Sequence, residues 1–463
     1  MTSSKLCALC NGIIDAGWLA AVVVTPLYFN GYSSTVVEPD KLAVLRTIVS
    51  IMAAAWLVQW IEQRRKPSPQ PAVSLRAPFV LPMLLLVAVH LLATFTSIVP
   101  RISFFGAYSR PQGVDAILTY VVLFALVLSG LRTRRQLNRL IEAIILTSFP
   151  VALYGIIQQL GLDPQQWSDY FGDRITSTLG NPIFLAAYLI ILFPITFAKI
   201  VENLRALVQA RRAMAPQVAG VVVYAAIACV QSAAIVLAQS RGPWLGWFAG
   251  FFLFVVLLAL AFRYQRFVIG VFGLGFAGIV FLVILNLPGA ALQPLRALPM
   301  LDRLGRLANP TGEFRLLTWS NAARLVMPHA PVQFPDGAPE RLNVIRPLVG
   351  YGPDTMALVY PQVSSPDPFS LNTVTDRSHN GTWDALVITG MLGLLAYQFL
   401  FLSIFFYGLR GLGLLETQRA CKTFIALWFG LGLAGGLSAI LVGQPGLLGV
   451  GMPAGNIAAV LIV

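Results

Sequence analysis

Charged residues are scarce in this sequence. Asp, Glu, Lys and Arg together make up 11% of its 463 residues, while hydrophobic residues make up 57%. A soluble globular chain carries about 25% charged residues, because its water-exposed surface needs them. The composition therefore predicts an integral membrane protein, with the lipid bilayer as a partner, and argues against an ordinary soluble domain.

Cysteine and histidine are also rare, with four and three residues. Cys7 and Cys10 form a C-x-x-C, but no second pair or histidine cluster accompanies them, so the spacing does not indicate a metal or redox site. The sequence contains no D-x-D, H-E-x-x-H, P-loop or G-x-S-x-G motif. These absences weigh against metal-dependent and ATP-driven mechanisms, and we expect neither a metal nor a cofactor.

Long apolar runs take the place of the missing charge. Most are about 17–22 residues long, which is enough for a helix to cross a hydrocarbon core. They lie at 13–29, 42–61, 79–99, 114–131, 140–160, 182–198, 217–238, 243–262, 267–287, 382–409, 423–442 and 447–463. Because a helix satisfies its own backbone polar groups in lipid, the fold class is predicted as all-α, a polytopic membrane protein with about 12 transmembrane helices.

The net charge of +13 is distributed unevenly along the chain. Basic clusters fall in alternate short loops, at 64–66, 132–139, 205–212, 263–266 and 410–422. By the positive-inside rule these loops and both termini are cytoplasmic. Orientation in the membrane thus accounts for the positive charge, and no DNA-binding motif argues for a nucleic acid partner.

One long polar segment, at 288–380, separates the ninth apolar run from the tenth. We therefore predict three regions: transmembrane helices 1–9 within 1–287, a long extracytoplasmic loop at 288–380, and transmembrane helices 10–12 within 381–463. A connection of roughly 90 residues is too long for an idle loop. It contains two helix signals, one from Pro310 to Pro328 and a shorter one opened by Pro353 and closed by Pro361.

Polar residues collect at the starts of the even-numbered helices, which this topology places on the outer face. Arg174 precedes the sixth helix, Arg241 the eighth, and Arg377, His379 and Asn380 the tenth. A helix start carries unpaired N–H groups and a partial positive charge, so it favours anions. If the bundle brings these ends together, they form a pocket for a polyanion.

Arginine is the main basic residue on the predicted outer side. The arginines there are Arg101, Arg110, Arg174, Arg241, Arg303, Arg306, Arg315, Arg324, Arg341, Arg346 and Arg377. The guanidinium group is planar and always charged, so it suits bidentate contacts with phosphate. The simpler interpretation of each is an anchor that reaches to lipid headgroups.

The histidines and Asn380 have simple interpretations too. His379 is either a capping or packing residue or a general base, since its pKa lies close to neutral pH. Asn380 is better explained as a helix cap than as a glycosylation sequon. His90 stands within an apolar run, where a polar side chain is costly, and we expect it to form an interhelical hydrogen bond.

Four stretches, in order, resemble the motifs of the O-antigen ligase and polymerase superfamily. They are "DRITSTLGNPIFLAAYL", "LAQSRGPWLGWFAG", "EFRLLTWSNAARL" with "RPLVGYGPDTMALVYP", and "RSHNGTWDALVITGMLGLLAY". The resemblance extends from about Arg174 to Tyr397. It implies a GT-C-like fold and a metal-independent glycosyltransferase that takes a glycan from undecaprenyl diphosphate at the outer face of the bacterial cytoplasmic membrane.

The same resemblance assigns roles to individual residues. Arg241 matches the family's arginine at an outside turn, Arg315 its long-loop arginine, and His379 its histidine before the following helix. Arg174 is a weaker match because it precedes its motif's core. We expect Arg241, Arg315 and Arg174 to bind the donor diphosphate and His379 to orient or deprotonate the acceptor hydroxyl. Asn380 and Arg377 are expected to support them.

Several functions remain open at this stage. The acceptor is a glycolipid such as lipopolysaccharide core in an O-antigen ligase, a second lipid-linked glycan in a polysaccharide polymerase, or a serine or threonine in a protein O-oligosaccharyltransferase. From different classes, a secondary transporter would also have about twelve helices, but with binding groups near mid-membrane, and a non-catalytic scaffold would release no undecaprenyl diphosphate.

Overall fold

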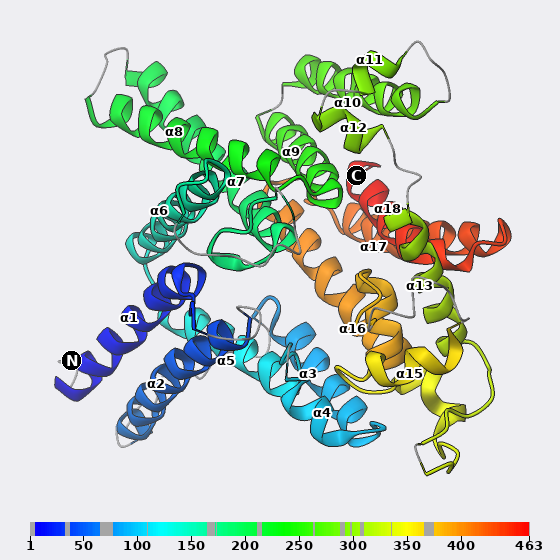
Figure 1. Ribbon diagram of the computed structural model, residues 1–463. Helices are drawn as coiled ribbons and strands as arrows, with labels where there is room; N and C mark the ends of the chain where they lie inside the picture. Colours follow the sequence, from blue (N-terminus) through cyan, green and yellow to red (C-terminus); the bar gives the residue numbers. More distant parts are fainter. Residues whose placement is uncertain are drawn as a thin grey trace. The chain divides into compact units, whose positions relative to one another are not determined.

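The structure is a computed structural model, and its regular secondary structure is helical throughout the residues that it describes (Figure 1). The described ranges are 5–32, 38–64, 77–108, 110–163, 172, 174–210, 215–262, 264–287, 292–296, 299–305, 310–334, 336–364 and 375–462. The all-α fold class predicted from the apolar runs is confirmed for this part of the chain.

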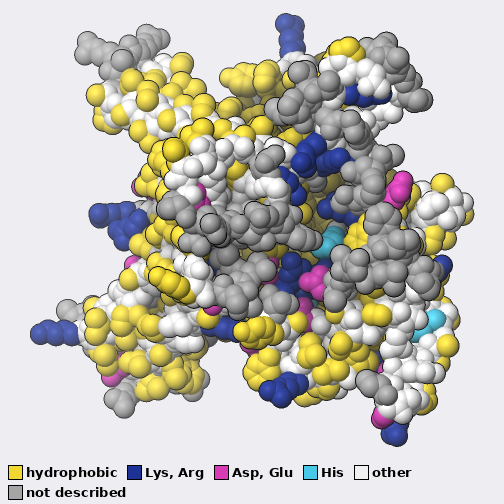
Figure 2. Space-filling view, viewed as in Figure 1, with side chains coloured by type: hydrophobic (Ala, Val, Ile, Leu, Met, Phe, Trp, Pro, Cys, Tyr) yellow, Lys and Arg dark blue, Asp and Glu magenta, His cyan; other side chains and the backbone are white. Residues whose placement is uncertain are grey.

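Ten of the described helical segments are long and apolar enough to cross a membrane. They are α1 (Lys5–Leu27), α2 (Glu38–Arg64), α6 (Arg134–Gln159), α7 (Pro182–Ala210), α8 (Ala215–Leu237), α9 (Arg241–Ala261), α10 (Gln265–Asn286), α16 (Gly381–Gly411), α17 (Gln418–Leu441), and η5 (Pro445–Leu447) with α18 (Leu448–Ile462). In Figure 2, hydrophobic side chains cover much of the visible surface of these helices. A polytopic membrane protein fits these helices.

Two further apolar helices are shorter, α3 (Val80–Phe95) and α5 (Val114–Gly130). All twelve predicted runs thus coincide with helices, although the crossing of the membrane by all twelve stays a prediction. Some predicted basic loops prove to be helical. α6 begins at Arg134, where Thr133 and Gln136 form a reciprocal capping box that satisfies two end groups, and α7 continues to Ala210.

The chain forms two compact units. The first comprises Met1–Gln70 and Val122–Leu307, and the second Pro71–Val121 and Ala308–Val463. The polar segment predicted at 288–380 contributes to both, because α11 (Gln293–Arg296) and α12 (Pro299–Leu304) belong to the first unit and the helices from α13 onward to the second.

The first unit packs around two apolar cores. One core joins α6, α7, α8 and α9, and includes Leu185, Leu189, Ile235 and Trp244, whose indole N–H donates to the Ile235 carbonyl at 2.8 Å. The other core packs Trp18 of α1 against α2 and α5. Burying the polar end of a tryptophan with a partner avoids the cost of an unpaired donor.

The second unit is built around α16. It contains α3, α4 (Pro100–Phe105), α13 (Pro310–Val326), η4 (Asn343–Ile345), α14 (Arg346–Val349), α15 (Met356–Val363), α17 and α18. Its core includes Tyr351, Met356, Trp383 and Leu386. α13 agrees with the predicted helix, whereas α15 begins at Met356 and retains Pro361 inside it, so that Pro361 does not close the helix as predicted.

α16 is broken in the middle, at Gly390, where the backbone takes a φ of 66°. The break leaves the carbonyls of Val387 and Ile388 without helical partners, and they accept hydrogen bonds of 2.9 Å from the backbone N–H groups of Tyr351 and Gly352. Irregular backbone at membrane depth is tolerated only when such groups are satisfied. The apolar run at 382–409, predicted as one transmembrane helix, is thus interrupted at Gly390.

Candidate functional site

The predicted catalytic residue, His379, lies in the short loop that leads into α16. Its side chain is exposed, and its backbone has a φ of 55°, in the left-handed region that non-glycine residues seldom occupy. Such a conformation costs roughly 1–3 kcal/mol and persists only where the surroundings hold it. Hydrogen bonds made by the neighbouring residues Ser378 and Asn380 hold the loop in place.

Ser378 and Asn380 fix the loop on either side of His379. The Ser378 backbone N–H and hydroxyl both donate to the Asp384 carboxylate, at 2.8 and 2.6 Å. The Asn380 side chain accepts from the N–H groups of Thr382 and Trp383, at 3.0 and 3.3 Å. The capping role predicted for Asn380 is confirmed, and the imidazole of His379 is presented outward by a loop anchored at both ends.

α13 reaches the same loop through Trp319. The indole N–H of Trp319 donates to the Ser378 carbonyl at 2.8 Å. Arg315 precedes Trp319 by four residues, so the two side chains lie on one face of α13. The long polar segment thus brings Arg315 into the neighbourhood of His379, as the resemblance implied, although the two lie 64 positions apart in the sequence.

The electrostatic environment of His379 favours the neutral imidazole. The packed loop removes water from part of the ring and lowers its pKa below the ordinary value. Asp376 and Asp384 raise the pKa, while Arg315 and Arg110 lower it, and the net direction is downward. A neutral ring at neutral pH is the form that accepts a proton.

Two ion pairs hold the segment before His379. Asp376 pairs with Arg110 at 3.1 Å, and Arg377 pairs with Asp354 at 2.5 Å. The second carboxylate oxygen of Asp354 accepts from the backbone N–H of Gln112 at 2.9 Å. Arg377 therefore positions the loop, since its charge is already balanced; its supporting role in the chemistry stays a prediction.

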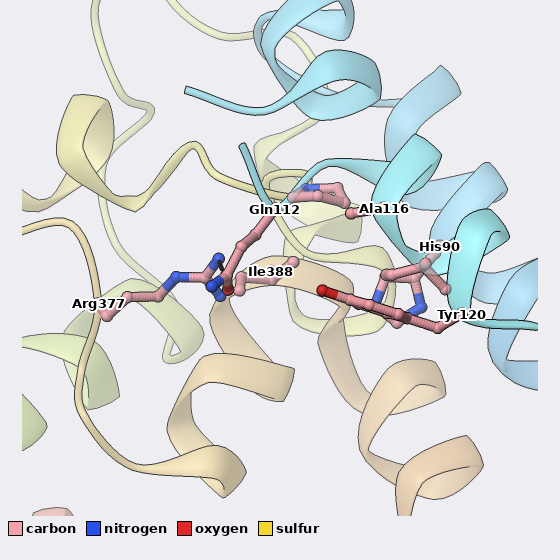
Figure 3. A pocket seen from close by; sticks show the side chains of 8 residues that line it. His90, Gln112, Ala116, Tyr120, Arg377 and Ile388 are labelled. Atoms are coloured by element: carbon pink, nitrogen blue, oxygen red, sulfur yellow. Dashed lines mark hydrogen bonds between the residues drawn. The ribbon is translucent and has the colours of Figure 1, made fainter. Parts of the chain in front are cut away.

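A cavity of about 230 Å³ lies beside Arg377, between α3, α5 and the broken part of α16 (Figure 3). Its wall includes His90, which the sequence interpretation missed as a member of any site. His90 Nδ1 lies 2.8 Å from the carbonyl of Leu86 in its own helix, instead of forming the interhelical bond that we expected. The polar side chain in this apolar run thus faces a cavity.

Two arginines of the first unit meet at the turn between α8 and α9. Arg174 donates to the carbonyl of Ala238 at 3.1 Å and to the hydroxyl of Ser240 at 2.5 Å. Arg303 of α12 donates to the carbonyl of Gln239 at 3.1 Å. Within the described residues neither guanidinium forms an ion pair, and burial, then the charge of Arg303, lower the pKa of Arg174. This arrangement leaves uncompensated positive charge at the turn.

Arg241 is the first residue of α9, directly after this turn. Three arginines and a helix start therefore share one small region, and this combination suits a phosphate group. The sequence interpretation placed Arg174 and Arg241 here but missed Arg303. No signal in the sequence distinguished Arg303 from the other arginines of the long segment, because only the packing of α12 brings it to the turn.

The predicted residues thus form two groups. His379, Arg315, Arg377 and Asn380 belong to the second unit, whereas Arg174 contacts the α8–α9 turn of the first unit and Arg241 follows that turn in the chain. The prediction that both groups bind one donor stays a prediction.

Comparisons with protein-family models, curated proteins and solved structures find no match for this chain. The resemblance to the O-antigen ligase superfamily therefore rests on the motifs alone.

Proposed function

We propose that this protein transfers a glycan from undecaprenyl diphosphate to an acceptor on the outer face of a bacterial cytoplasmic membrane, in the manner of an O-antigen ligase. The observation that carries the proposal is the setting of His379. A strained loop, anchored at both ends, presents a neutral imidazole to solvent beside the arginine-bearing face of α13. The resemblance of the ordered sequence motifs to the O-antigen ligase superfamily supports a lipid-diphosphate-linked glycan as the substrate.

The chemistry requires one base and stabilisation of one leaving group. The acceptor hydroxyl oxygen attacks the anomeric carbon of the donor glycan, and the bond from that carbon to the diphosphate oxygen breaks. His379 takes the hydroxyl proton, and undecaprenyl diphosphate leaves with the electron pair. A guanidinium aimed at the leaving oxygens stabilises their growing negative charge.

Arginines supply that stabilisation in this proposal. Arg315 stands near the base, and Arg174, Arg241 and Arg303 provide a cluster suited to phosphate at the α8–α9 turn. Diphosphate is a good leaving group, so positioning and charge stabilisation provide most of what the reaction needs. The fold would be of the GT-C type, with both termini cytoplasmic and the site facing the periplasm or cell exterior.

The decisive experiment compares two histidine variants in reconstituted membranes that contain a lipid-diphosphate glycan and candidate acceptors. His379→Ala should lower transfer by about 10²–10⁴-fold, the usual contribution of a general base. His329→Gln is the matched control, because His329 bonds to the Tyr351 hydroxyl and plays no part in the proposed chemistry. Transfer by a folded His379→Ala variant at the wild-type rate would overturn the assignment.

Mass analysis of the product distinguishes the acceptor classes. A glycolipid product indicates ligase activity, a lengthened lipid-linked glycan indicates a polymerase, and a glycosylated serine or threonine indicates protein glycosylation. Release of undecaprenyl diphosphate separates all three enzymes from a transporter or a scaffold.

A further inference from the structure

We propose that the cavity beside Arg377 binds one neutral sugar ring of the acceptor. The inference of a binding site rests on the lining of the cavity, whereas its assignment to the acceptor rests on the proposed function. The cavity is formed within the second unit by α3, the start of α5, the Pro353 turn and the broken part of α16.

The size of the cavity suits a single ring. Its volume is about 230 Å³. Sites for drug-sized ligands usually begin near 300 Å³. A space of this size suits one monosaccharide unit.

The charge balance argues against an anion as the ligand. The one guanidinium in the wall, that of Arg377, is paired with Asp354 at 2.5 Å and also donates to the Gln112 side-chain oxygen at 2.9 Å. A phosphate placed here would have to compete with the carboxylate for the same donors. The remaining polar side chains of the wall are uncharged or neutralised, which favours a neutral polar ligand.

Hydrogen-bonding groups in the wall match the hydroxyls of a sugar. Because the oxygen of the Gln112 amide accepts from Arg377, its NH₂ end has no partner among the described residues and remains a donor. His90 Nδ1 must carry a proton to donate to the Leu86 carbonyl, so its Nε2 is an acceptor in the neutral ring. A hydroxyl group can satisfy both types of partner.

The other wall groups suit the faces of a sugar ring. His90 and Tyr120 both line the cavity, and in Figure 3 the Tyr120 hydroxyl is directed toward Ile388. An aromatic ring and the apolar side chains of Ala116 and Ile117 suit the C–H face of a pyranose. Donor, acceptor and apolar wall together are the usual elements of a specific small-molecule site.

The cavity also lies where an acceptor is needed. Arg377 forms part of its wall, and His379 follows two residues later. Consecutive Cα atoms are about 3.8 Å apart, so the Cα atoms of these two residues lie within about 8 Å of each other. A sugar held in the cavity therefore contacts the side chain of Arg377, in the segment that leads to His379.

The first test measures binding without transfer. Full-length protein in a detergent that contains no sugar is titrated with methyl glycosides of glucose, galactose and N-acetylglucosamine, and binding is followed by saturation-transfer NMR. We expect at least one glycoside to bind. Ala116→Leu fills the cavity and should abolish this binding. Ala125→Leu, the same change on an exposed part of the same helix, should leave it intact.

Gln112→Leu covers the case in which Ala116→Leu fails to fold. It removes the amide donor, so affinity should fall by about three- to tenfold, the value of one hydrogen bond. The proposal is overturned if no glycoside binds the wild type, or if folded Ala116→Leu binds as well as wild type. It is also overturned if no glycoside binds but inorganic pyrophosphate or octanol does, and Ala116→Leu abolishes that binding.

A second readout separates this proposal from the proposed function. In the transfer assay, the bound methyl glycoside should raise the KM for the acceptor and leave kcat unchanged. If no acceptor is ever glycosylated but Ala116-dependent sugar binding persists, the proposed function fails and the sugar site stands. If transfer proceeds and Ala116→Leu leaves the acceptor KM unchanged, the acceptor assignment fails.

Discussion

Replacing Gly390 by alanine should strongly destabilise the second unit and disorganise the site. A Cβ at this position would lie 2.3 Å from the carbonyl carbon and oxygen of Leu348 and 2.5 Å from the backbone nitrogen of Val349. Ordinary contacts of this kind begin near 3.4 Å, so the two backbones would have to separate by about 1 Å. The positive φ adds about 1–2 kcal/mol for any residue with a Cβ.

The separation would break the two hydrogen bonds that satisfy the opened helix. Tyr351 and Gly352 donate to the carbonyls of Val387 and Ile388 at 2.9 Å, and each buried group left unpaired costs about 1–3 kcal/mol. With the backbone strain, the expected loss is about 3–8 kcal/mol of unfolding free energy. Because Pro353 and Asp354 follow directly, the displacement would reach Arg377 and lower transfer as well.

The measurement is equilibrium unfolding in mixed micelles, followed by tryptophan fluorescence. Gly408→Ala is the matched control, since Gly408 lies in the same helix and its added Cβ would meet nothing within 4 Å. It should remain within about 1 kcal/mol of the wild type, because alanine favours a helix interior. A Gly390→Ala variant as stable as the Gly408→Ala variant would refute this account of the broken helix.

Three further predictions concern charge. Because the pKa of His379 lies below its ordinary value, transfer should persist at mildly acidic pH and fall as the pH drops through that pKa. Arg315→Met should shift this acidic fall in activity to higher pH, and Asp376→Asn should shift it to lower pH. If neither variant shifts the pH profile, the assignment of His379 as the base is contradicted. Glu340→Gln should lower the free energy of unfolding by about 3–5 kcal/mol, because Glu340 pairs at 2.8 Å with buried Arg346, whose charge would then have no partner carboxylate. A decrease under about 1 kcal/mol would show that the fold does not need this ion pair. Arg303→Met should raise the KM for the lipid-diphosphate donor about tenfold, and Arg303→Lys should have a KM between those of Arg303→Met and the wild type. An unchanged KM in Arg303→Met would exclude Arg303 from the phosphate site.

Helix positions were largely predictable from the apolar runs because lipid-facing surfaces impose a local and strong pattern. Asn380 was predictable as a cap because capping depends on its immediate neighbours. The extent of α7 was not, since the basic residues near Arg205 read equally well as a loop or as the end of a long helix. Hydropathy reports solvent preference and does not report where a helix stops.

Broken helices and buried polar contacts depend on segments that are distant in the chain. From the sequence alone, Gly390 resembles an ordinary small residue of an apolar helix; only the fold shows the backbone of Leu348 and Val349 packed against it. The role proposed for Arg303 depends on its contact with the α8–α9 turn, and that proposed for His90 depends on the cavity that it lines. Sequence spacing cannot encode these neighbours, because the separation along the chain is unrelated to the distance in the fold.

By itself, the sequence determined that the chain is helical, with apolar runs long enough to cross a membrane. It also singled out His379, Arg315 and Arg241 through local motifs, since composition and short patterns carry that information. The tertiary structure alone decided that α16 is broken at Gly390, that a strained loop presents His379 beside α13, and that Arg377 closes a small neutral cavity. Each of these features needs backbone or side-chain groups from separate segments to satisfy one another, and only packing brings those groups together.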